Sequence, residues 1–452
     1  MSIFRAYDVR GIFNKDLTTE IAEKIGKGFG TFIGEGKNIS VGMDGRLSGK
    51  VLRDGIFAGL TSVGCDVIDI GMVPTPVLYF NVANKGLDGG IMITASHNPP
   101  EWNGFKIVKK MALPCSDGMG LEQVKENVFK DKFNPSKRKG VVKKYEKILS
   151  DYFEYVLQRI KIGKKLKVVL DPGNGVSSLT APELFKRLGF DVVVLNEKID
   201  GNFPAHPPEP TEENLQQLKE EVVRVNADFG VAYDGDGDRA VFVDEKGNVI
   251  SSGSVIIMIF AKYFLEKQKN AKIVFDVCSS KAVEDVIKTN GGIPIVSKVG
   301  YAHIKNKMSE EGAVFGGEYS NHLYFSEMYY IDDGVFGSLK MAEILSNTDK
   351  KLSEIVDSIP KYPAIFDWNF TCPDEVKFDV IKKLKNKSEK LGMKIIDLDG
   401  VKLLFDDGWV LWRASNTQPQ IKVYVEADTE DRLTELRKFA EDELKKAMGV
   451  IE

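Results

Sequence analysis

Three aspartates at alternating positions stand in the stretch 234–239, Asp-Gly-Asp-Gly-Asp-Arg. The intervening glycines let the backbone fold tightly, so the three carboxylates can converge on one hard divalent cation. An EF-hand shares this spacing and Glu245 stands at its twelfth position, but Arg239 replaces the glycine that an EF-hand needs at the sixth. A solvated acidic turn is the alternative interpretation. Because like charges packed this closely repel one another, we expect a metal ion among them.

Ser96 is the second residue with chemical potential. It follows the apolar run 90–94 and precedes Asn-Pro-Pro at 98–100, which cannot continue a strand or a helix. Ser96 therefore belongs to a loop at the end of a strand, and taken alone it is most simply a turn residue. A nucleophilic dyad with the adjacent His97 is not indicated, because a base must be oriented toward the hydroxyl and backed by a third group. Serine hydrolase chemistry is therefore disfavoured.

Two later loops are rich in groups that recognise sugars and phosphates. Residues 316–322, Gly-Gly-Glu-Tyr-Ser-Asn-His, offer a carboxylate, two hydroxyls, an amide and an imidazole, a set that suits sugar hydroxyls but also occurs in ordinary polar loops. Residues 413–419, Arg-Ala-Ser-Asn-Thr-Gln-Pro, lie between the apolar stretches 409–412 and 421–425. Their guanidinium, hydroxyls and backbone N–H donors suit a phosphate. A polar hairpin tip is an equally good interpretation of this second loop alone.

Three segments share one plan that would position these loops. Each has an apolar strand ending at Asp, then a turn, a helix and a second apolar strand, and they span residues 39–70, 166–194 and 272–296. Strands alternating with helices at these lengths predict βαβ units with largely parallel sheets. The first three domains should therefore be α/β and related to one another.

The tail from about Ala364 follows a different plan. It predicts a strand, a helix over 374–391, strands separated by Asp-Gly turns at 399–400 and 407–408, and a final charged helix from Thr429, which is a small α+β domain. The basic stretch 132–147 and a polar helix over 145–161 are expected to link the first two domains. The expected domains are residues 1–145, 146–250, 251–363 and 364–452.

The composition excludes several classes of protein. The chain has 452 residues, and its 62 basic and 66 acidic residues give a net charge of −4, so no overall positive field indicates nucleic acid. The four cysteines show no CxxC spacing, which argues against a zinc site or a disulfide framework.

The first residues lack a signal peptide's apolar core, and runs such as 255–260 are too short to span a bilayer. No Walker A or complete GxGxxG pattern is present. We expect a cytoplasmic protein without a membrane partner.

Taken together and in this order, the motifs resemble those of the α-D-phosphohexomutase superfamily, which includes phosphomannomutases, phosphoglucomutases and phosphoglucosamine mutases. The resemblance covers the whole chain. The stretches 94–99, Thr-Ala-Ser-His-Asn-Pro, and 234–239 are highly specific for that superfamily. The implied fold is four domains around a central cleft, three α/β with mixed sheets and a last one that resembles the TATA-binding protein.

The resemblance also assigns roles to residues. It implies that Ser96 carries a phosphoryl group, and that Asp234, Asp236 and Asp238 hold Mg²⁺ together with an oxygen of the Ser96 phosphate. The residues implied around the phosphoserine are Arg10, His97, Lys106 and Arg239. The residues expected to bind the substrate are Tyr7, Lys298, Glu318, Ser320 and His322, together with Arg413, Ser415, Asn416 and Thr417 at the phosphate that is not reacting.

The implied reaction moves a phosphoryl group between two positions of a hexose. Transfer from Ser96 to a sugar hydroxyl would give a hexose 1,6-bisphosphate, which must turn end for end before its other phosphate returns to Ser96. Mg²⁺ and cationic side chains would neutralise the equatorial oxygens, while a general base, unassigned, takes the hydroxyl proton. The partners implied are small sugar phosphates, and the chain is expected to be a monomer or a small homo-oligomer.

Two departures from the superfamily's usual pattern bear on the choice of sugar. Asn321 stands where relatives commonly have glycine, and Tyr301 where many have histidine. The opening stretch 4–11, Phe-Arg-Ala-Tyr-Asp-Val-Arg-Gly, looks more like the mannose/glucose branch than the glucosamine branch. Mannose and glucose phosphates are therefore the expected substrates, and phosphoglucosamine mutase is the alternative.

Two more remote functions stay open from the residues. An apolar strand ending in Asp-Gly-Asp at 234–236 looks like the DxDx(T/V) nucleophile motif of aspartyl-phosphate phosphatases, although Asp238 stands where Thr or Val belongs. A non-catalytic sugar-phosphate binder would need the loop at 413–419 but neither Ser96 nor a metal. A phosphoserine survives acid and mild base, whereas an aspartyl phosphate is labile to hydroxylamine, so the two enzymes can be distinguished chemically.

Overall fold

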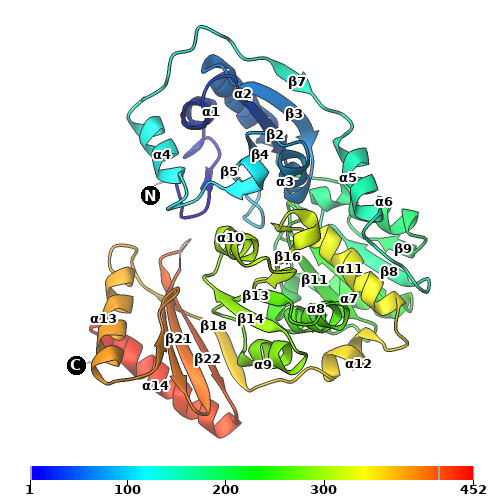
Figure 1. The fold of residues 1–452 in the computed structure, drawn as a ribbon, viewed down its shortest axis with the longest axis vertical. Coiled ribbons are helices and arrows are strands. Elements are labelled where there is room, and N and C mark those ends of the chain that lie inside the picture. The colour runs from blue at the N-terminus through cyan, green and yellow to red at the C-terminus, as the bar shows by residue number, and fades with distance from the viewer. Residues whose placement is uncertain (1–2, 416–417, 451–452) are drawn as a thin grey trace.

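The computed structural model describes residues 3–415 and 418–450. Within these residues the chain forms four β-sheets, one of seven strands and three of five. Figure 1 shows the sheets in chain order, from the blue amino-terminal unit to the orange and red carboxyl-terminal unit, each with helices packed around it. No helix in the described part of the chain is long and apolar enough to cross a membrane.

The first sheet carries the Ser96 loop. Its strands are β1 (Val9–Ile12), β2 (Asn38–Met43), β3 (Asp66–Met72), β4 (Gly89–Ile93), β5 (Trp102–Lys109), β6 (Leu113–Pro114) and β7 (Val142–Lys144), and its helices are α1 (Thr19–Ile33), α2 (Gly49–Ser62), α3 (Thr75–Asn84) and α4 (Leu121–Phe129). The strand order is β1-β5-β4-β2-β3-β7, with β6 paired to β5. β2 is parallel to β3 and β4, whereas β5 is antiparallel to β4 and β1. The sheet is therefore mixed.

The second sheet carries the aspartate loop. Its strands are β8 (Lys167–Asp171), β9 (Asp191–Val194), β10 (Phe229–Tyr233), β11 (Ala240–Asp244) and β12 (Val249–Ile250), and its helices are α5 (Ile148–Leu157), α6 (Ala181–Arg187) and α7 (Gln216–Arg224). The order is β12-β11-β10-β8-β9. β10 and β11 form an antiparallel hairpin with Tyr233 opposite Ala240, so the aspartates lie at its tip.

The third sheet repeats this arrangement. Its strands are β13 (Lys272–Asp276), β14 (Ile293–Ser297), β15 (Phe315–Gly317), β16 (Leu323–Phe325) and β17 (Ile331–Asp332), and its helices are α8 (Gly253–Lys267), α9 (Lys281–Thr289), α10 (Tyr301–Glu311), α11 (Gly334–Ser346) and α12 (Leu352–Asp357). The order is β14-β13-β15-β16-β17. The parallel pair that the repeated plan predicts is present in all three units, as β2–β3, β8–β9 and β13–β14.

The fourth sheet is fully antiparallel. Its strands are β18 (Ala364–Thr371), β19 (Ile395–Ile396), β20 (Val401–Phe405), β21 (Gly408–Ala414) and β22 (Gln420–Ala427), in the order β18-β22-β21-β20-β19, and its helices are α13 (Lys377–Lys390) and α14 (Glu430–Met448). The side chain of Thr429 caps α14 by accepting a hydrogen bond of 3.2 Å from the Arg432 N–H. The α/β class with a final α+β unit is therefore confirmed.

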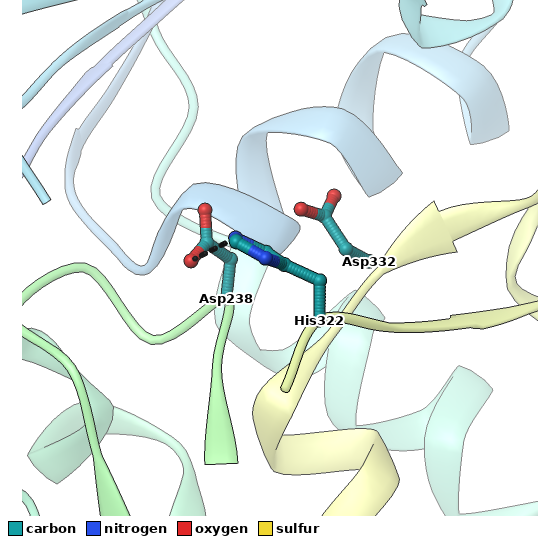
Figure 2. Close-up of side chains that lie close together, drawn as sticks. All are labelled: Asp238, His322 and Asp332. Carbon is teal, nitrogen blue, oxygen red and sulfur yellow. Dashed lines mark ion pairs between the residues drawn. The ribbon is translucent and has the colours of Figure 1, made fainter. Parts of the chain in front are cut away.

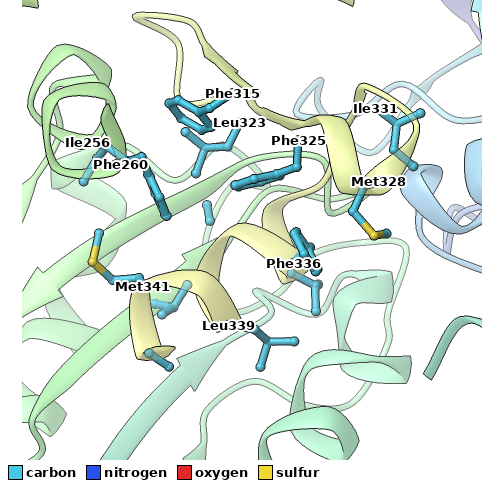
Figure 3. Close-up of a cluster of buried hydrophobic side chains, with 14 of the residues drawn as sticks. Ile256, Phe260, Phe315, Leu323, Phe325, Met328, Ile331, Phe336, Leu339 and Met341 are labelled. Atoms are coloured by element: carbon cyan, nitrogen blue, oxygen red, sulfur yellow. The ribbon is translucent and has the colours of Figure 1, made fainter. Parts of the chain in front are cut away.

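One apolar cluster is shared by the first three units, and the first unit also has a cluster of its own around Phe29. One buried cluster runs from Phe80 of α3 through Phe229 of β10 to the third sheet, whereas the fourth unit has a separate cluster around Trp412. Figure 3 shows the part of the shared cluster where side chains of α8 and α11 pack against the third sheet, with the rings of Phe325 and Phe336 meeting edge to face at 4.9 Å. Burial of these side chains ties the loops of the first three units to one frame.

Three sequence expectations are wrong. The stretch 132–147 is not simply a linker, because β7 within it pairs in parallel with β3 and extends the first sheet. The helix expected to be polar is α5, which buries Tyr152, Phe153 and Val156. The Tyr152 hydroxyl also donates a hydrogen bond of 2.8 Å to Asp333, so this helix holds the units together. The sheets of the first three units are mixed rather than largely parallel.

Candidate active site

Ser96 lies in the loop that follows β4 and is 3% exposed. Its φ of +50° is in the left-handed region, which a non-glycine residue adopts only when its surroundings hold it there. Its hydroxyl donates a hydrogen bond of 2.8 Å to Asp234 Oδ2 and lies 3.2 Å from His97 Nδ1. The loop therefore presents its hydroxyl directly to the aspartate loop of the second unit.

Asp234, Asp236 and Asp238 are buried at the tip of the β10–β11 hairpin, and one oxygen from each lies within 4.8 Å of the others. Burial, with the charges of Asp238 and Asp236, raises the pKa of Asp234 well above its ordinary value. Asp236 Oδ1 and Asp238 Oδ1 are buried without a hydrogen-bond partner. Buried carboxylates with unsatisfied oxygens suit a hard cation that prefers oxygen ligands, so the described residues fit Mg²⁺.

Lys106 of β5 contacts the same aspartates. Its ammonium donates a hydrogen bond of 2.7 Å to Asp236 Oδ2 and a shorter one to Asp238 Oδ2. Burial lowers the pKa of Lys106, but the charges of Asp236 and Asp238 outweigh burial and raise it above its ordinary value. Lys106 therefore stays charged within the acidic cluster.

Two arginines complete a cationic ring around Ser96. Arg10 of β1 donates from Nε to Asp8 at 2.8 Å and from Nη1 to the side chain of Asn98. Arg239 donates from Nε to Asp234 Oδ2 at 3.2 Å, while its Nη2 is buried without a partner. Burial, followed by the charges of Arg239 and Arg10, holds the pKa of His97 well below its ordinary value, so its imidazole is neutral at neutral pH. Such a ring suits a dianionic phosphate.

The loop between β15 and β16 reaches the aspartates from the third unit. His322 Nε2 lies 3.4 Å from Asp238 Oδ1 and its Nδ1 lies 3.0 Å from Ser320 Oγ. Burial lowers the pKa of His322, but Asp238 raises it to about 9, so the imidazole is protonated at neutral pH. Figure 2 shows Asp332 on the other side of this ring. His322, Asp238 and Asp332 each offer an atom within 4.8 Å of the others, and Asp332 was not among the residues predicted.

The carboxylate of Glu318 is hydrogen-bonded to other residues of the third unit. Its carboxylate accepts hydrogen bonds of 2.6 Å from the Gly300 N–H and 2.6 Å from the Tyr324 hydroxyl. Asn321, the first departure, has a φ of +68° and donates a hydrogen bond of 3.0 Å to the Ser251 carbonyl. Glycine and asparagine are the residues that adopt this conformation most readily, so the departure keeps the loop geometry.

The start of α10 is where three units meet. The Tyr7 hydroxyl donates a hydrogen bond of 2.8 Å to the Val299 carbonyl, beside the exposed Lys298. Tyr301, the second departure, stacks on Tyr79 and donates a hydrogen bond of 3.2 Å to the Tyr7 carbonyl. His303, which was not predicted, faces the Tyr7 ring at 6.0 Å. Burial, then the charge of Lys298, lowers the pKa of His303, although Asp399 and Glu318 oppose this.

The last predicted loop is partly described. Arg413, near the end of β21, donates a hydrogen bond of 2.6 Å from Nε to Asp399 Oδ2. The Gln418 N–H donates a hydrogen bond of 3.2 Å to Ser415 Oγ. Asn416 and Thr417 lie outside the described residues, so their predicted contacts are not placed. The carboxylate of Asp399 also accepts a hydrogen bond of 3.4 Å from the Val299 N–H, which brings the fourth unit to the start of α10.

A buried serine that hydrogen-bonds to an acidic loop whose carboxylates fit a cation, beside arginine and lysine side chains, is the set of parts that a phosphotransferase uses. Comparison of the sequence with models of known protein families identifies the family. Models of the phosphoglucomutase/phosphomannomutase family match the chain in its alpha/beta/alpha domains I, II and III at residues 1–135, 150–247 and 252–362, and in its C-terminal domain at 368–443. This chain belongs to the phosphoglucomutase/phosphomannomutase family, and the resemblance inferred from the motifs is confirmed.

Individual relatives agree along nearly the whole chain. The phosphoglucomutase/phosphomannomutase of Thermococcus kodakarensis is 39% identical over 451 residues, covering 96% of both chains. The phosphomannomutase/phosphoglucomutase of Pseudomonas aeruginosa PAO1 is 39% identical over 450 residues, covering 98% of this chain and 96% of the other. A crystal structure of a family protein from Burkholderia thailandensis superposes with a TM-score of 0.91 at 33% identity, covering 99% of this chain and 97% of the other.

Proposed function

We propose that this chain interconverts hexose 1-phosphate and hexose 6-phosphate, with mannose or glucose as the sugar, through a phosphorylated Ser96 and a hexose 1,6-bisphosphate. The observation that carries this proposal is the hydrogen bond of 2.8 Å between Ser96 Oγ and Asp234. It joins a nucleophile from one unit to an acidic cluster from another. The relatives named above, phosphoglucomutases and phosphomannomutases at 39% identity, support the same reaction.

Asp234, Asp236 and Asp238 would hold Mg²⁺ with an oxygen on Ser96, and the ion would neutralise charge on the transferring phosphoryl group. Arg10, Arg239 and Lys106 add three positive charges within the same cluster of contacts. Because these donors are held by buried partners, they need little reorganisation when charge develops. His322, protonated at neutral pH, is placed to donate rather than to accept a proton there.

The substrate's distal phosphate would bind at Arg413, Ser415, Asn416 and Thr417, with Lys298 beside them. Tyr7, Glu318, Ser320 and His322 would meet the sugar. A clamp that accepts either phosphate allows the bisphosphate to return in the opposite orientation. This arrangement is supported by the position of α10, because the Val299 N–H just before this helix donates a hydrogen bond to Asp399, the same carboxylate that binds Arg413.

We also propose the division of the chain at residues 145/146, 250/251 and 363/364. Its support is that β7 ends at Lys144, β12 at Ile250 and β18 begins at Ala364. We propose a cytoplasmic enzyme that acts as a monomer or a small homo-oligomer. The cytoplasmic placement is supported by four buried cysteines that are unpaired in the structure.

A substrate panel tests the function. Purified protein with Mg²⁺ and a trace of hexose 1,6-bisphosphate should convert mannose 1-phosphate or glucose 1-phosphate to the 6-phosphate faster than it converts glucosamine or N-acetylglucosamine 1-phosphate. Preference for glucosamine 1-phosphate would make it a phosphoglucosamine mutase instead. Radiolabel from the bisphosphate should resist hydroxylamine, because a phosphoserine is an ester. Label released by hydroxylamine would identify an aspartyl-phosphate enzyme, and binding without label or turnover would identify a non-catalytic binder.

A further inference from the structure

Arg46 follows β2 and does not contact the aspartate cluster, yet its side chain is fully buried. Nη1 donates hydrogen bonds to the Pro99 carbonyl at 2.6 Å and the Trp102 carbonyl at 3.0 Å. Nη2 donates to the Ser96 carbonyl at 2.9 Å and the Asn98 carbonyl at 2.6 Å. One guanidinium therefore gathers four carbonyl oxygens of the Ser96 loop.

The fifth guanidinium donor is also satisfied. Nε donates to Asp44 Oδ2 at 3.2 Å, and that oxygen also accepts a hydrogen bond of 2.7 Å from Thr94 Oγ1. Thr94 Oγ1 in turn accepts a hydrogen bond of 2.9 Å from the Ser96 N–H. Asp44, Arg46 and Thr94 thus form a closed network that reaches Ser96 from both its N–H and its carbonyl.

This network accounts for the backbone conformation of Ser96. Its φ of +50° is unfavourable for an L-residue, and inward carbonyls that lie close together repel one another. A planar guanidinium with five N–H donors can hydrogen-bond to all of these carbonyl oxygens. A lysine ammonium has only three donors and does not hold them in one plane. Arg46 is the group that makes this loop conformation stable.

Residues of the second unit pack against this network. The Phe203 ring lies 5.2 Å from the Arg46 guanidinium, and a Cβ at Gly235 would lie 2.6 Å from the Ser96 carbonyl. The same carbonyl is therefore held between Arg46 and the aspartate loop. A shift of the Ser96 loop would change the distance between its hydroxyl and Asp234.

We propose that Arg46 is a positioning residue for phosphoryl transfer: it fixes the Ser96 loop so that the hydroxyl, or its phosphate, faces the aspartates in both half-reactions. This inference rests on the proposed function. Ser96 gives and receives a phosphoryl group in each cycle, and a misplacement of about 1 Å can cost about 100-fold in rate. Arg46 itself does not need to touch the sugar.

The test compares Arg46→Lys with Arg53→Lys. Arg53 is a matched control, because its guanidinium also lies 5.2 Å from a phenyl ring and pairs with an aspartate, but it makes none of the loop contacts that Arg46 makes. We expect Arg46→Lys to lower kcat about 100-fold with KM nearly unchanged, since the substrate groups of the third and fourth units are untouched. Arg53→Lys should leave both constants near those of the wild type.

Chemical rescue separates positioning from general damage. In Arg46→Ala, millimolar guanidinium should restore part of kcat, whereas urea, which is neutral and of similar shape, should not. If Arg46→Ala does not fold, the kcat and KM of Arg46→Lys alone decide whether Arg46 is a positioning residue. An unchanged kcat, a loss confined to KM, or a loss of kcat that follows the unfolded fraction would overturn the proposal.

Amide hydrogen exchange distinguishes failure of this inference from failure of the proposed function. Arg46→Lys should speed exchange in residues 94–103 and leave the aspartate hairpin's strands protected, whatever reaction the wild type catalyses. A wild type without mutase activity would refute the proposed function. Unchanged exchange in residues 94–103 would refute the positioning role, even in an active mutase.

Discussion

Ser96 Oγ and Asp234 Oδ2 lie 2.8 Å apart, so the nucleophile and the acidic cluster meet although they come from different sheets. Ser96→Ala should therefore lower kcat by about 1,000-fold or more, because no phosphoenzyme can form. Affinity for the sugar phosphate, measured by calorimetry, should change little, since the methyl group of the new alanine is separate from the proposed site of the distal phosphate. Ser62→Ala, on the exposed side of α2, is the control. Retained turnover in Ser96→Ala would contradict the assigned nucleophile.

Lys106 and the proposed metal ion neutralise the same carboxylates. In Lys106→Met, the buried Asp236 and Asp238 lose their contact with a buried ammonium, and breaking such a pair costs about 3–5 kcal/mol. We expect the free energy of unfolding with chelator to fall by about this amount, and Mg²⁺ to restore more stability than it adds to the wild type. Denaturant titrations with EDTA and with Mg²⁺ measure both.

The control for that experiment is Lys109→Met on the same strand. Lys109 donates its hydrogen bond, of 2.9 Å, to the Met119 carbonyl rather than to an aspartate. Its variant should show the wild-type response to Mg²⁺. Equal gains from Mg²⁺ in wild type and Lys106→Met would show that the ion binds elsewhere.

The sequence indicates local features of this site well. The apolar strand expected to end in Asp-Gly-Asp at 234–236 is β10, and it forms a hairpin with β11 because apolar runs on either side of a Gly-rich turn pair through neighbouring residues. Asp332 and Arg46 were missed, since neither stands in a motif. Their roles depend on which strands and loops lie side by side, and on contacts between segments distant in sequence, such as Arg46 and Trp102.

The error at α5 has a different origin. Its apolar residues Ile148, Tyr152 and Val156 follow the spacing of an amphipathic helix, but the basic stretch before it gives the region a polar average. The periodicity was the better signal. Conversely, Lys106 was found only through the resemblance, because its contacts depend on the position of β5 opposite β4, with Lys106 facing Met92 in the register.

Asn321 should tolerate glycine better than alanine. Its φ of +68° costs an ordinary L-residue about 1–2 kcal/mol, whereas glycine adopts it freely. Asn321→Gly should keep the loop and lose only the hydrogen bond to the Ser251 carbonyl, a net change of about 1 kcal/mol. Asn321→Ala loses the same bond and adds backbone strain, so it should be less stable than Asn321→Gly. Equal stabilities in denaturant titrations would contradict the strain.

His206 and His303 should give the stability opposite dependences on pH. His206 Nε2 lies 3.2 Å from Asp171 Oδ2, and although burial lowers the pKa of His206, this hydrogen bond and charge raise it above its ordinary value of 6.5. Its contribution is therefore fully present below about pH 6.5 and is lost as the pH rises through the folded-state pKa. His303, whose pKa burial lowers, instead costs stability as the pH falls below about 6.5.

We expect His206→Gln to be less stable than the wild type at pH 5.5, by about 1 kcal/mol, with the difference shrinking toward pH 8.5. His303→Gln removes an imidazole that the folded protein keeps from being protonated. The free energy of unfolding of this variant, compared with that of the wild type, should therefore rise as the pH is lowered from 8.5 to 5.5. Each variant is the control for the other, because both replace an imidazole by the same amide. Guanidinium chloride titrations at the two pH values give the four differences. Changes of the same sign between the two pH values in both variants would contradict the opposite pKa shifts, because a loss of packing common to both does not depend on pH.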